Sequence, residues 1–239
     1  MSFHERLGGG YWVRRPMPQL DHEYWGTVVD PSGVERNLLS AHEDAIQRDD
    51  MVEEVAYLID APSVLDLGCG TGVAMAELVS QKPRRVVGID PDRRALDVAR
   101  ARGAGLALAH LEDLEYGFGG LLCHHTVEHM SDPLKTLHAA VSLCVPGARV
   151  VISTPDFNSP SAQASGDRYR LLHDRTHVSL FSTDSLVRMM SLLGLAVVRV
   201  SHPFYGTRWE REAREWNPEG KEWSPPAPGN IVSVYAVKR

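Results

Sequence analysis

Long apolar runs are absent from this chain of 239 residues, and cysteine is scarce. No stretch approaches the roughly 18 consecutive apolar residues that a transmembrane helix requires. Residues 1–10 lack the apolar segment of a signal peptide, so we expect a cytoplasmic protein. The three cysteines, Cys69, Cys123 and Cys144, are odd in number and widely spaced. Their spacing predicts buried thiols in a reducing cytosol rather than a disulfide framework or a four-cysteine zinc site.

A strong excess of charge of either sign is also missing. Hydrophobic residues make up 43% of the chain and charged residues 23%, which excludes a disordered or fibrous protein. The net charge of −6 is mildly acidic, and such a surface is a poor general binder of nucleic acid or anionic lipid. We therefore expect a small-molecule partner, with no nucleic acid and no membrane.

Strand-like and helix-like patterns alternate through most of the chain. Residues 1–36 are rich in glycine, proline and aromatics without a period, which predicts an irregular N-terminal arm. Residues 37–60 predict a helix that Pro62 ends. The predicted strands that follow are 63–67, 85–89, 106–109, 120–123, 149–153, 195–200 and 231–237. Their alternation with helices predicts a single α/β domain over residues 37–239, with a mainly parallel sheet covered on both faces.

Capping residues and prolines mark the ends of three of the predicted helices. Asp132 and Pro133 form a cap followed by a first-turn proline. Ser182 is the expected N-cap of the next helix, which Gly194 ends. Pro91 is expected to open the helix after the second strand. Residues 201–230, with three Trp and five Pro, are too long for a hairpin loop. They predict a lid over the site or an interface in a possible homodimer.

Three glycines end the first predicted strand, in residues 64–72. Gly68, Gly70 and Gly72 lie at the carboxyl edge of the sheet, where ligands bind in open parallel sheets. Glycines there allow a sharp turn and a close approach of the ligand. The spacing is Gly-x-Gly-x-Gly, whereas dinucleotide sites carry Gly-x-Gly-x-x-Gly and bind a pyrophosphate. This spacing disfavours the alternative of an NAD-dependent oxidoreductase.

Two acidic residues narrow the choice of ligand. Asp66 precedes the glycines, and its negative charge suits a cationic ligand rather than a pyrophosphate. Asp90 ends the second strand, 20 residues after Gly70, where a carboxylate can accept both hydroxyls of a ribose. A nucleoside that carries positive charge but no phosphate is S-adenosylmethionine.

Residues 64–72 resemble motif I of the class I S-adenosylmethionine-dependent methyltransferases, and residues 87–90 resemble the acidic motif that follows it. Further segments are similar to the same family: 127–133, 145–148, 153–156 and 177–182. The resemblance covers about residues 60–200 and is to the small-molecule O-methyltransferases of ubiquinone-biosynthesis type. It implies a Rossmann-like seven-stranded sheet whose last strand is antiparallel. It also implies methyl transfer to a hydroxyl of a sugar, polysaccharide or natural-product acceptor. An N-methyltransferase and a non-catalytic, cofactor-binding partner subunit stay open as alternatives.

The resemblance also implies which residues contact the cofactor. Those expected to do so are Asp66, Gly68, Cys69, Gly70, Gly72, Asp90, Leu111, Glu112, Cys123 and His124. The glycine loop would border the methionine part, whose amino group Asp66 would hold. Asp90 would bind the ribose, Leu111 and Glu112 would meet the adenine, and residues 123–124 would line the sulfonium side through backbone groups. The family often has Asp at the position of His110, so this chain departs from the family pattern at the adenine contact.

Histidines are the candidates for the chemical step. Methyl transfer is an in-line displacement that depends on holding donor and acceptor aligned. An alcohol acceptor must also lose its proton to a base, and histidine has a suitable pKa. The candidate bases are His129, His173 and His177. Alternatively, His129 only caps the helix that follows.

A divalent metal is the last expectation. His125, Glu128 and His129 lie at i, i+3 and i+4, so a helical turn would project all three from one face. In the relatives that this segment resembles, the matching positions are Glu, Glu and His and bind magnesium. His125 is a departure that favours a softer metal than Mg²⁺, such as Mn²⁺, or weakens magnesium binding. The alternative is that Glu128 and His129 merely hydrogen-bond a loop.

Overall fold

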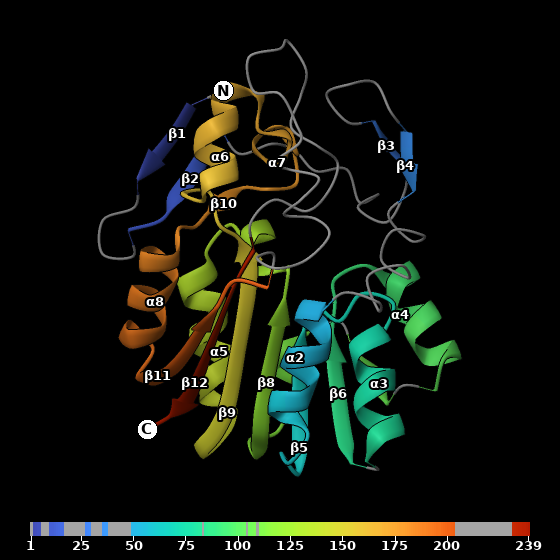
Figure 1. The fold of residues 1–239 in the computed structure, drawn as a ribbon. Helices are drawn as coiled ribbons and strands as arrows, with labels where there is room; N and C mark the ends of the chain where they lie inside the picture. The colour runs from blue at the N-terminus through green and yellow to red at the C-terminus, as the bar shows by residue number, and fades with distance from the viewer. Residues whose placement is uncertain are drawn as a thin grey trace.

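The computed structural model describes residues 2–5, 10–16, 27–29, 35–37, 49–82, 84–103, 105–108, 110–203 and 231–239. A seven-stranded sheet with the order β11-β12-β9-β8-β5-β6-β7 forms its centre (Figure 1). In that order the strands are Leu195–Ser201, Ile231–Lys238, Cys144–Pro155, Phe118–His124, Ser63–Leu67, Arg85–Ile89 and Leu106–Leu108. Strands β5 to β9 are parallel, and β12 is antiparallel to both β9 and β11. This confirms the predicted Rossmann-like sheet with an antiparallel last strand.

The central strands are apolar on both faces. Every residue of β5 is buried, which is typical of a parallel strand covered on two sides. Successive residues serve opposite faces, so Val64 lies in one hydrophobic cluster and Leu65 in the other. The first face is covered by α2 (Asp49–Leu58), α3 (Val73–Gln81) and α4 (Arg93–Ala101). The second is covered by α5 (Pro133–Ser142) and α8 (Thr183–Leu192).

Two of the three predicted helix starts are confirmed. Asp132 caps α5, and Ser182 caps α8 in a reciprocal capping box with Ser185. The prediction for Pro91 is wrong, because α4 begins at Arg93. The Asp92 side chain accepts a hydrogen bond from the backbone of Arg94 at 2.9 Å, and this places the cap one residue after the proline.

The described segments of the N-terminal region include short strands, and there the prediction of an irregular arm over residues 1–36 is corrected. Strands β1 (Ser2–Glu5) and β2 (Trp12–Arg15) pair with β10 (Ser179–Leu180) in a second sheet of order β1-β2-β10. Strands β3 (Thr27–Val29) and β4 (Glu35–Asn37) form a two-stranded sheet. These strands are short, and the partner of β2 is distant in the sequence, so periodicity could not reveal them.

Other expectations fall on residues that the structure does not describe. Of the helix predicted for residues 37–60, residues 38–48 lie outside the described ranges, as does most of the insert at 201–230. The lid, the homodimer and the division into arm and domain stay predictions. Among the described residues, no helix has both the length and the apolar character needed to cross a membrane.

The segment between β9 and α8 is more structured than a loop. It contains α6 (Pro160–Ser165), a 3-10 turn (Gly166–Arg168), α7 (Arg170–His173) and β10. Figure 1 shows α6, α7 and the small sheet beyond the end of the large sheet at which β8 ends. The short 3-10 helices η2 (Leu111–Asp113) and η3 (Val127–His129) follow β7 and β8. The predicted site residues therefore gather at one edge.

Candidate active site

The glycine loop turns sharply at the end of β5. Gly68, Gly70 and Gly72 have φ angles of 81°, 50° and 76°. This left-handed region is readily open to glycine alone. The backbone N–H of Gly68 donates to the carbonyl of Ile89 at 2.7 Å, and a Cβ atom on Gly68 would overlap the side chain of Thr126. The loop is thus packed tightly between the ends of β6 and β8.

The carboxylate of Asp90 is buried and joins two loops. Its Oδ2 accepts from the backbone N–H of Gly70 at 3.0 Å, and its Oδ1 accepts from that of Asp92 at 2.9 Å. These bonds fix the carboxylate at the carboxyl ends of β5 and β6. That is the position where a ribose is expected.

Asp66 is a buried carboxylate whose pKa is raised. Burial raises its pKa to about 7, and the negative charges of Asp90 and Glu54 act in the same direction. A desolvated carboxyl group among like charges gains most from a bound cation. A positively charged ligand group beside Asp66 would relieve this repulsion, and the contact expected from the sequence stays a prediction.

The other predicted cofactor residues are divided between core and surface. Leu111 packs against the core, whereas Glu112 is exposed on η2. The thiols of Cys69 and Cys123 are buried, and burial raises the pKa of each. Cys144 is buried as well, and none of the three forms a disulfide. The prediction of buried thiols is confirmed.

His124 ends β8 in a buried polar cluster. Its Nδ1 lies 2.7 Å from Oε2 of Glu54 on α2 and 3.1 Å from Oγ of Ser153. Ser233 donates to the other oxygen of Glu54 at 2.8 Å. The sequence analysis missed Glu54. The available signal was its position three residues after Met51, on the apolar stripe of the predicted helix.

His125 has a left-handed backbone, with φ 47°, and no other non-glycine residue of the described ranges has a positive φ. Such a conformation is unfavourable for a residue with a Cβ atom and is concentrated at functional sites. Its N–H donates to the carbonyl of Ser153 at 3.1 Å, and its Nδ1 lies 3.3 Å from Oε1 of Glu128. The three residues at 125, 128 and 129 therefore do not share a single helical turn, because η3 begins only at Val127.

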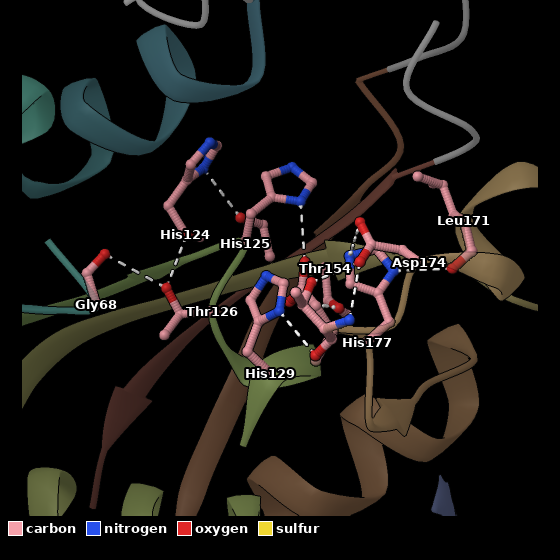
Figure 2. A network of polar contacts seen from close by, with 12 residues as sticks. Gly68, His124, His125, Thr126, His129, Thr154, Leu171, Asp174 and His177 are labelled. Carbon is pink, nitrogen blue, oxygen red and sulfur yellow. Dashed lines mark hydrogen bonds and ion pairs between the residues drawn. The ribbon is translucent and has the colours of Figure 1, made fainter. Parts of the chain in front are cut away.

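Glu128 is buried, and the histidines that interact with it, His125, His129 and His177, lie together in Figure 2. Thr154 donates to its Oε2 at 3.0 Å. Burial alone would raise the pKa of Glu128. The hydrogen bond from His125 and the charges of His129 and His177 overcome burial and lower this pKa to about 2. Glu128 is therefore ionised at neutral pH.

The rings of His129 and His177 lie side by side, with centroids 5.0 Å apart. Nδ1 of His129 donates to the carbonyl of Thr176 at 3.0 Å, and Nδ1 of His177 donates to that of Leu171 at 2.9 Å. A carbonyl oxygen only accepts, so Nε2 is the basic nitrogen of each neutral ring. Burial lowers the pKa of His129, while Glu128 opposes the shift. His129 can therefore act as a base at neutral pH.

Asp174 supports this pair, although the sequence analysis did not single it out. Its Oδ2 lies 3.8 Å from Nε2 of His177, and its Oδ1 accepts from the hydroxyl of Thr176 at 2.6 Å. Burial would raise the pKa of Asp174, but the charge of His177 and the bonds from Thr176 lower it to about 2. By contrast, His173 bonds the carbonyl of Asp167 at 2.6 Å and lies outside the cluster.

The structure brings together three groups that can hold a metal ion. Ligand atoms of Glu128, His129 and His177 all lie within 4.8 Å of one another. Two of them belong to the set predicted from sequence, and His177 takes the place of His125. The exchange follows from the backbone, because His125 precedes the 3-10 turn whereas His177 comes from the loop that packs over it.

The order of the large sheet and its glycine loop define a class I S-adenosylmethionine-dependent methyltransferase fold. A solved methyltransferase of Thermotoga maritima, described as a possible histamine N-methyltransferase, covers 84% of this chain and 96% of its own, with a TM-score of 0.57 and 20% identity. Magnesium protoporphyrin IX methyltransferase of Synechocystis PCC 6803 covers 85% and 89%, with a TM-score of 0.61 and 14% identity. At such identities the likeness shows the fold alone.

The chain belongs to the methyltransferase domain family, which it matches over residues 34–200. It is 31% identical over 156 residues to the ubiquinone biosynthesis O-methyltransferase of Leptothrix cholodnii, covering 60% of this chain and 62% of that relative. The same enzyme of Alkalilimnicola ehrlichii is 31% identical over 142 residues, covering 55% and 56%. The match thus spans less than two thirds of these relatives. Family membership implies S-adenosylmethionine as cofactor and removes the oxidoreductase alternative.

Proposed function

We propose that this methyltransferase acts on a hydroxyl group of a small-molecule acceptor. The observation that carries the proposal is the pair of His129 and His177 beside the ionised Glu128. This group lies next to the cofactor loop, since Thr126 donates from its hydroxyl to the carbonyl of Gly68 at 3.4 Å. The partly matched relatives named above are O-methyltransferases, which supports oxygen as the acceptor atom.

In this proposal the cofactor lies along the carboxyl edge of β5, β6 and β8. Asp66 holds the ammonium group, which relieves the repulsion between buried carboxylates. Asp90 accepts from the ribose while the backbone bonds to Gly70 and Asp92 hold its carboxylate in place. Leu111 and Glu112 border the adenine, and the backbone at Cys123 and His124 lines the sulfonium side.

The transfer is an in-line displacement in which positioning supplies much of the acceleration. A lone pair of the acceptor oxygen forms the bond to the methyl carbon while the bond from carbon to sulfur breaks. The sulfur leaves as the neutral thioether of S-adenosylhomocysteine. The hydroxyl proton passes to Nε2 of His129 or His177, and Glu128 stabilises the resulting imidazolium.

A divalent metal is the second candidate, because Glu128, His129 and His177 supply oxygen and nitrogen ligands at one place. Such a donor set suits Mn²⁺ better than Mg²⁺, which prefers oxygen ligands alone. When bound, the ion supplies positive charge that lowers the pKa of an acceptor hydroxyl. A histidine that ligates a metal through Nε2 does not act as the base, so the two modes exclude each other.

A methyl-transfer screen against sugars, phenols and amines tests the proposal. We expect hydroxyl acceptors to be methylated and simple amines to be left unchanged. Methylation of amines alone would favour the N-methyltransferase. Cofactor binding without transfer to any acceptor class would favour the non-catalytic partner subunit. In parallel, S-adenosylmethionine should raise the melting temperature, and Asp90→Ala should remove most of that rise.

A further inference from the structure

We infer that Arg14 of β2 is a positioning residue, which fixes the loop of residues 171–178 so that His177 and His129 keep their orientation. Arg14 is 3% exposed. Its guanidinium Nη2 donates to the carbonyl of Leu172 at 2.9 Å and to that of Asp174 at 2.8 Å. Its backbone N–H donates to the carbonyl of Val178 at 2.8 Å. One residue from the N-terminal strand thus binds the loop at its start, middle and end.

The bound carbonyls lie between the groups that orient the two histidines. The carbonyl of Leu171, next to Leu172, accepts from Nδ1 of His177. Asp174 places its own carboxylate 3.8 Å from Nε2 of the same ring. The carbonyl of Thr176 accepts from Nδ1 of His129. A shift of the segment held by Arg14 would therefore disturb both rings.

The loop is supported on its other side by η3 and the residue after it. The N–H of Val178 donates to the carbonyl of Glu128 at 2.9 Å, and Ser179 donates from its hydroxyl to the carbonyl of Met130 at 2.7 Å. The loop thus lies between β2 and the segment that carries Glu128. Without the guanidinium, the loop would keep this second support and the backbone bond at Val178, and would lose the bonds at Leu172 and Asp174.

Strand β2 is itself anchored to the core. Tyr11 stacks on Phe181 with ring centroids 4.9 Å apart, and both residues are buried. Val13 is 1% exposed and belongs to the same hydrophobic cluster as the central strands. Arg14 therefore reaches the loop from a fixed support, which is what a positioning role requires.

The chemistry of the side chain suits this role. A guanidinium is planar, stays charged, and presents two hydrogens on one terminal nitrogen that can reach two carbonyl oxygens. A lysine ammonium is a compact point charge on a flexible stem and would hold the same carbonyls less rigidly. We therefore expect Arg14→Lys to retain only part of the effect.

The role given to His177 rests on the proposed function. The experiment therefore measures the orientation of the His177 ring in protein that has no methyl acceptor bound. Protein with ¹⁵N-labelled histidine is compared by NMR for the wild type, Arg14→Ala and Arg14→Lys. The matched control is Arg175→Ala, which removes a positive charge from the exposed side of the same loop. The affinity for S-adenosylhomocysteine, measured by calorimetry, shows whether the part of the protein expected to bind the cofactor is folded in each variant.

We expect the wild type to show a protected Nδ1–H resonance for His177, because Leu171 accepts from it. Arg14→Ala should lose this resonance while keeping cofactor affinity, Arg14→Lys should weaken it, and Arg175→Ala should leave it unchanged. Millimolar guanidinium should restore it in Arg14→Ala.

An unchanged resonance in Arg14→Ala, or an equal loss in Arg175→Ala, would overturn the inference. If Arg14→Ala fails to fold, an Arg14→Lys spectrum identical to the wild type overturns it instead. A wild-type enzyme that methylates no hydroxyl would contradict the proposed function and leave this result intact.

Discussion

His124 and Glu54 meet through a contact of 2.7 Å between Nδ1 and Oε2, although 70 residues separate them in the chain. The contact joins α2 to the end of β8, where the backbone is expected to line the sulfonium side of the cofactor. Glu54 is fully buried and also raises the pKa of Asp66. One carboxylate of α2 thus contributes both to packing and to the electrostatics of the cofactor site.

Replacing Glu54 by Ala should destabilise the protein. The change removes the acceptor of the Ser233 hydroxyl and one of the two contacts of His124 Nδ1, which keeps Ser153. A buried polar group that loses its partner costs about 1–3 kcal/mol. Urea denaturation measures the free energy of unfolding. The matched control is Glu53→Ala, since Glu53 is half exposed and its ion pair with Arg199 contributes less than about 1 kcal/mol. Equal losses for both variants would contradict this account.

Replacing Gly68 by Ala should abolish cofactor binding. The new Cβ atom would overlap Thr126, in addition to the left-handed φ of 81°. Gly103→Ala is the control, because Gly103 has a φ of 66° and a Cβ atom there would meet no heavy atom of the described residues within 4 Å, its chain neighbours aside. It should show only the backbone penalty, roughly 1–2 kcal/mol. Calorimetry with S-adenosylhomocysteine and thermal unfolding separate the two effects, and intact binding by Gly68→Ala would refute the prediction.

Cofactor affinity should increase as the pH rises through 7. The pKa of Asp66 is raised to about 7, so its carboxylate becomes available to the ammonium group only near and above that pH. Asp66→Asn should bind more weakly and lose this dependence, whereas Asp97→Asn, at an exposed carboxylate, should behave as the wild type. Titration calorimetry between pH 5.5 and pH 8.5, about one unit or more on each side of that value, measures the profile.

The raised pKa of Asp66 also affects the stability of the folded protein. A carboxyl group whose folded pKa is raised from 3.8 to about 7 contributes stability below pH 3.8 that is lost as the pH rises through 7. Relative to the wild type, cofactor-free Asp66→Asn should therefore gain stability from pH 4 to about pH 8. Denaturation at the two pH values checks the sign. A variant less stable than the wild type by the same amount at both would exclude a raised pKa.

Metal binding should depend on His177 and not on His173. Mn²⁺ titrated into metal-free protein should lose affinity in Glu128→Ala and His177→Ala, because both groups belong to the cluster. His173→Ala is the control, since His173 bonds the carbonyl of Asp167 instead. A loss of Mn²⁺ affinity in His125→Ala, with none in His177→Ala, would instead support the ligand set expected from the sequence. Full activity after exhaustive chelation would show that methyl transfer does not require a metal ion. Base-assisted transfer would then be the remaining mechanism.

Much of the large sheet could be predicted because its inner strands are continuous apolar runs. The predicted strands at 63–67 and 85–89 coincide with β5 and β6. Strand β9 extends past the predicted end at residue 153. Thr154 is polar, and its burial depends on a hydrogen bond to Glu128 that no local pattern reveals.

The candidate site was predictable where it rests on motifs and not where it rests on contacts between distant segments. The motif around Glu128 and His129 identified both residues, and the histidine-rich loop identified His177. Glu54 and Arg14 were missed, because their roles depend on partners far away in the chain. The positive φ of His125, which separates it from the turn that carries Glu128 and His129, could not be read from the sequence either.

The pairing of β2 with β10 sets an order for biosynthesis. Strand β2 is translated before the large sheet, but its partner, Ser179–Leu180, is translated only after five of the seven strands of that sheet. Until then one edge of β2 has no strand to pair with, and the backbone contacts of Arg14 cannot form. The loop that carries His177 is therefore completed late in translation, after the strands that end in the glycine loop and Asp90.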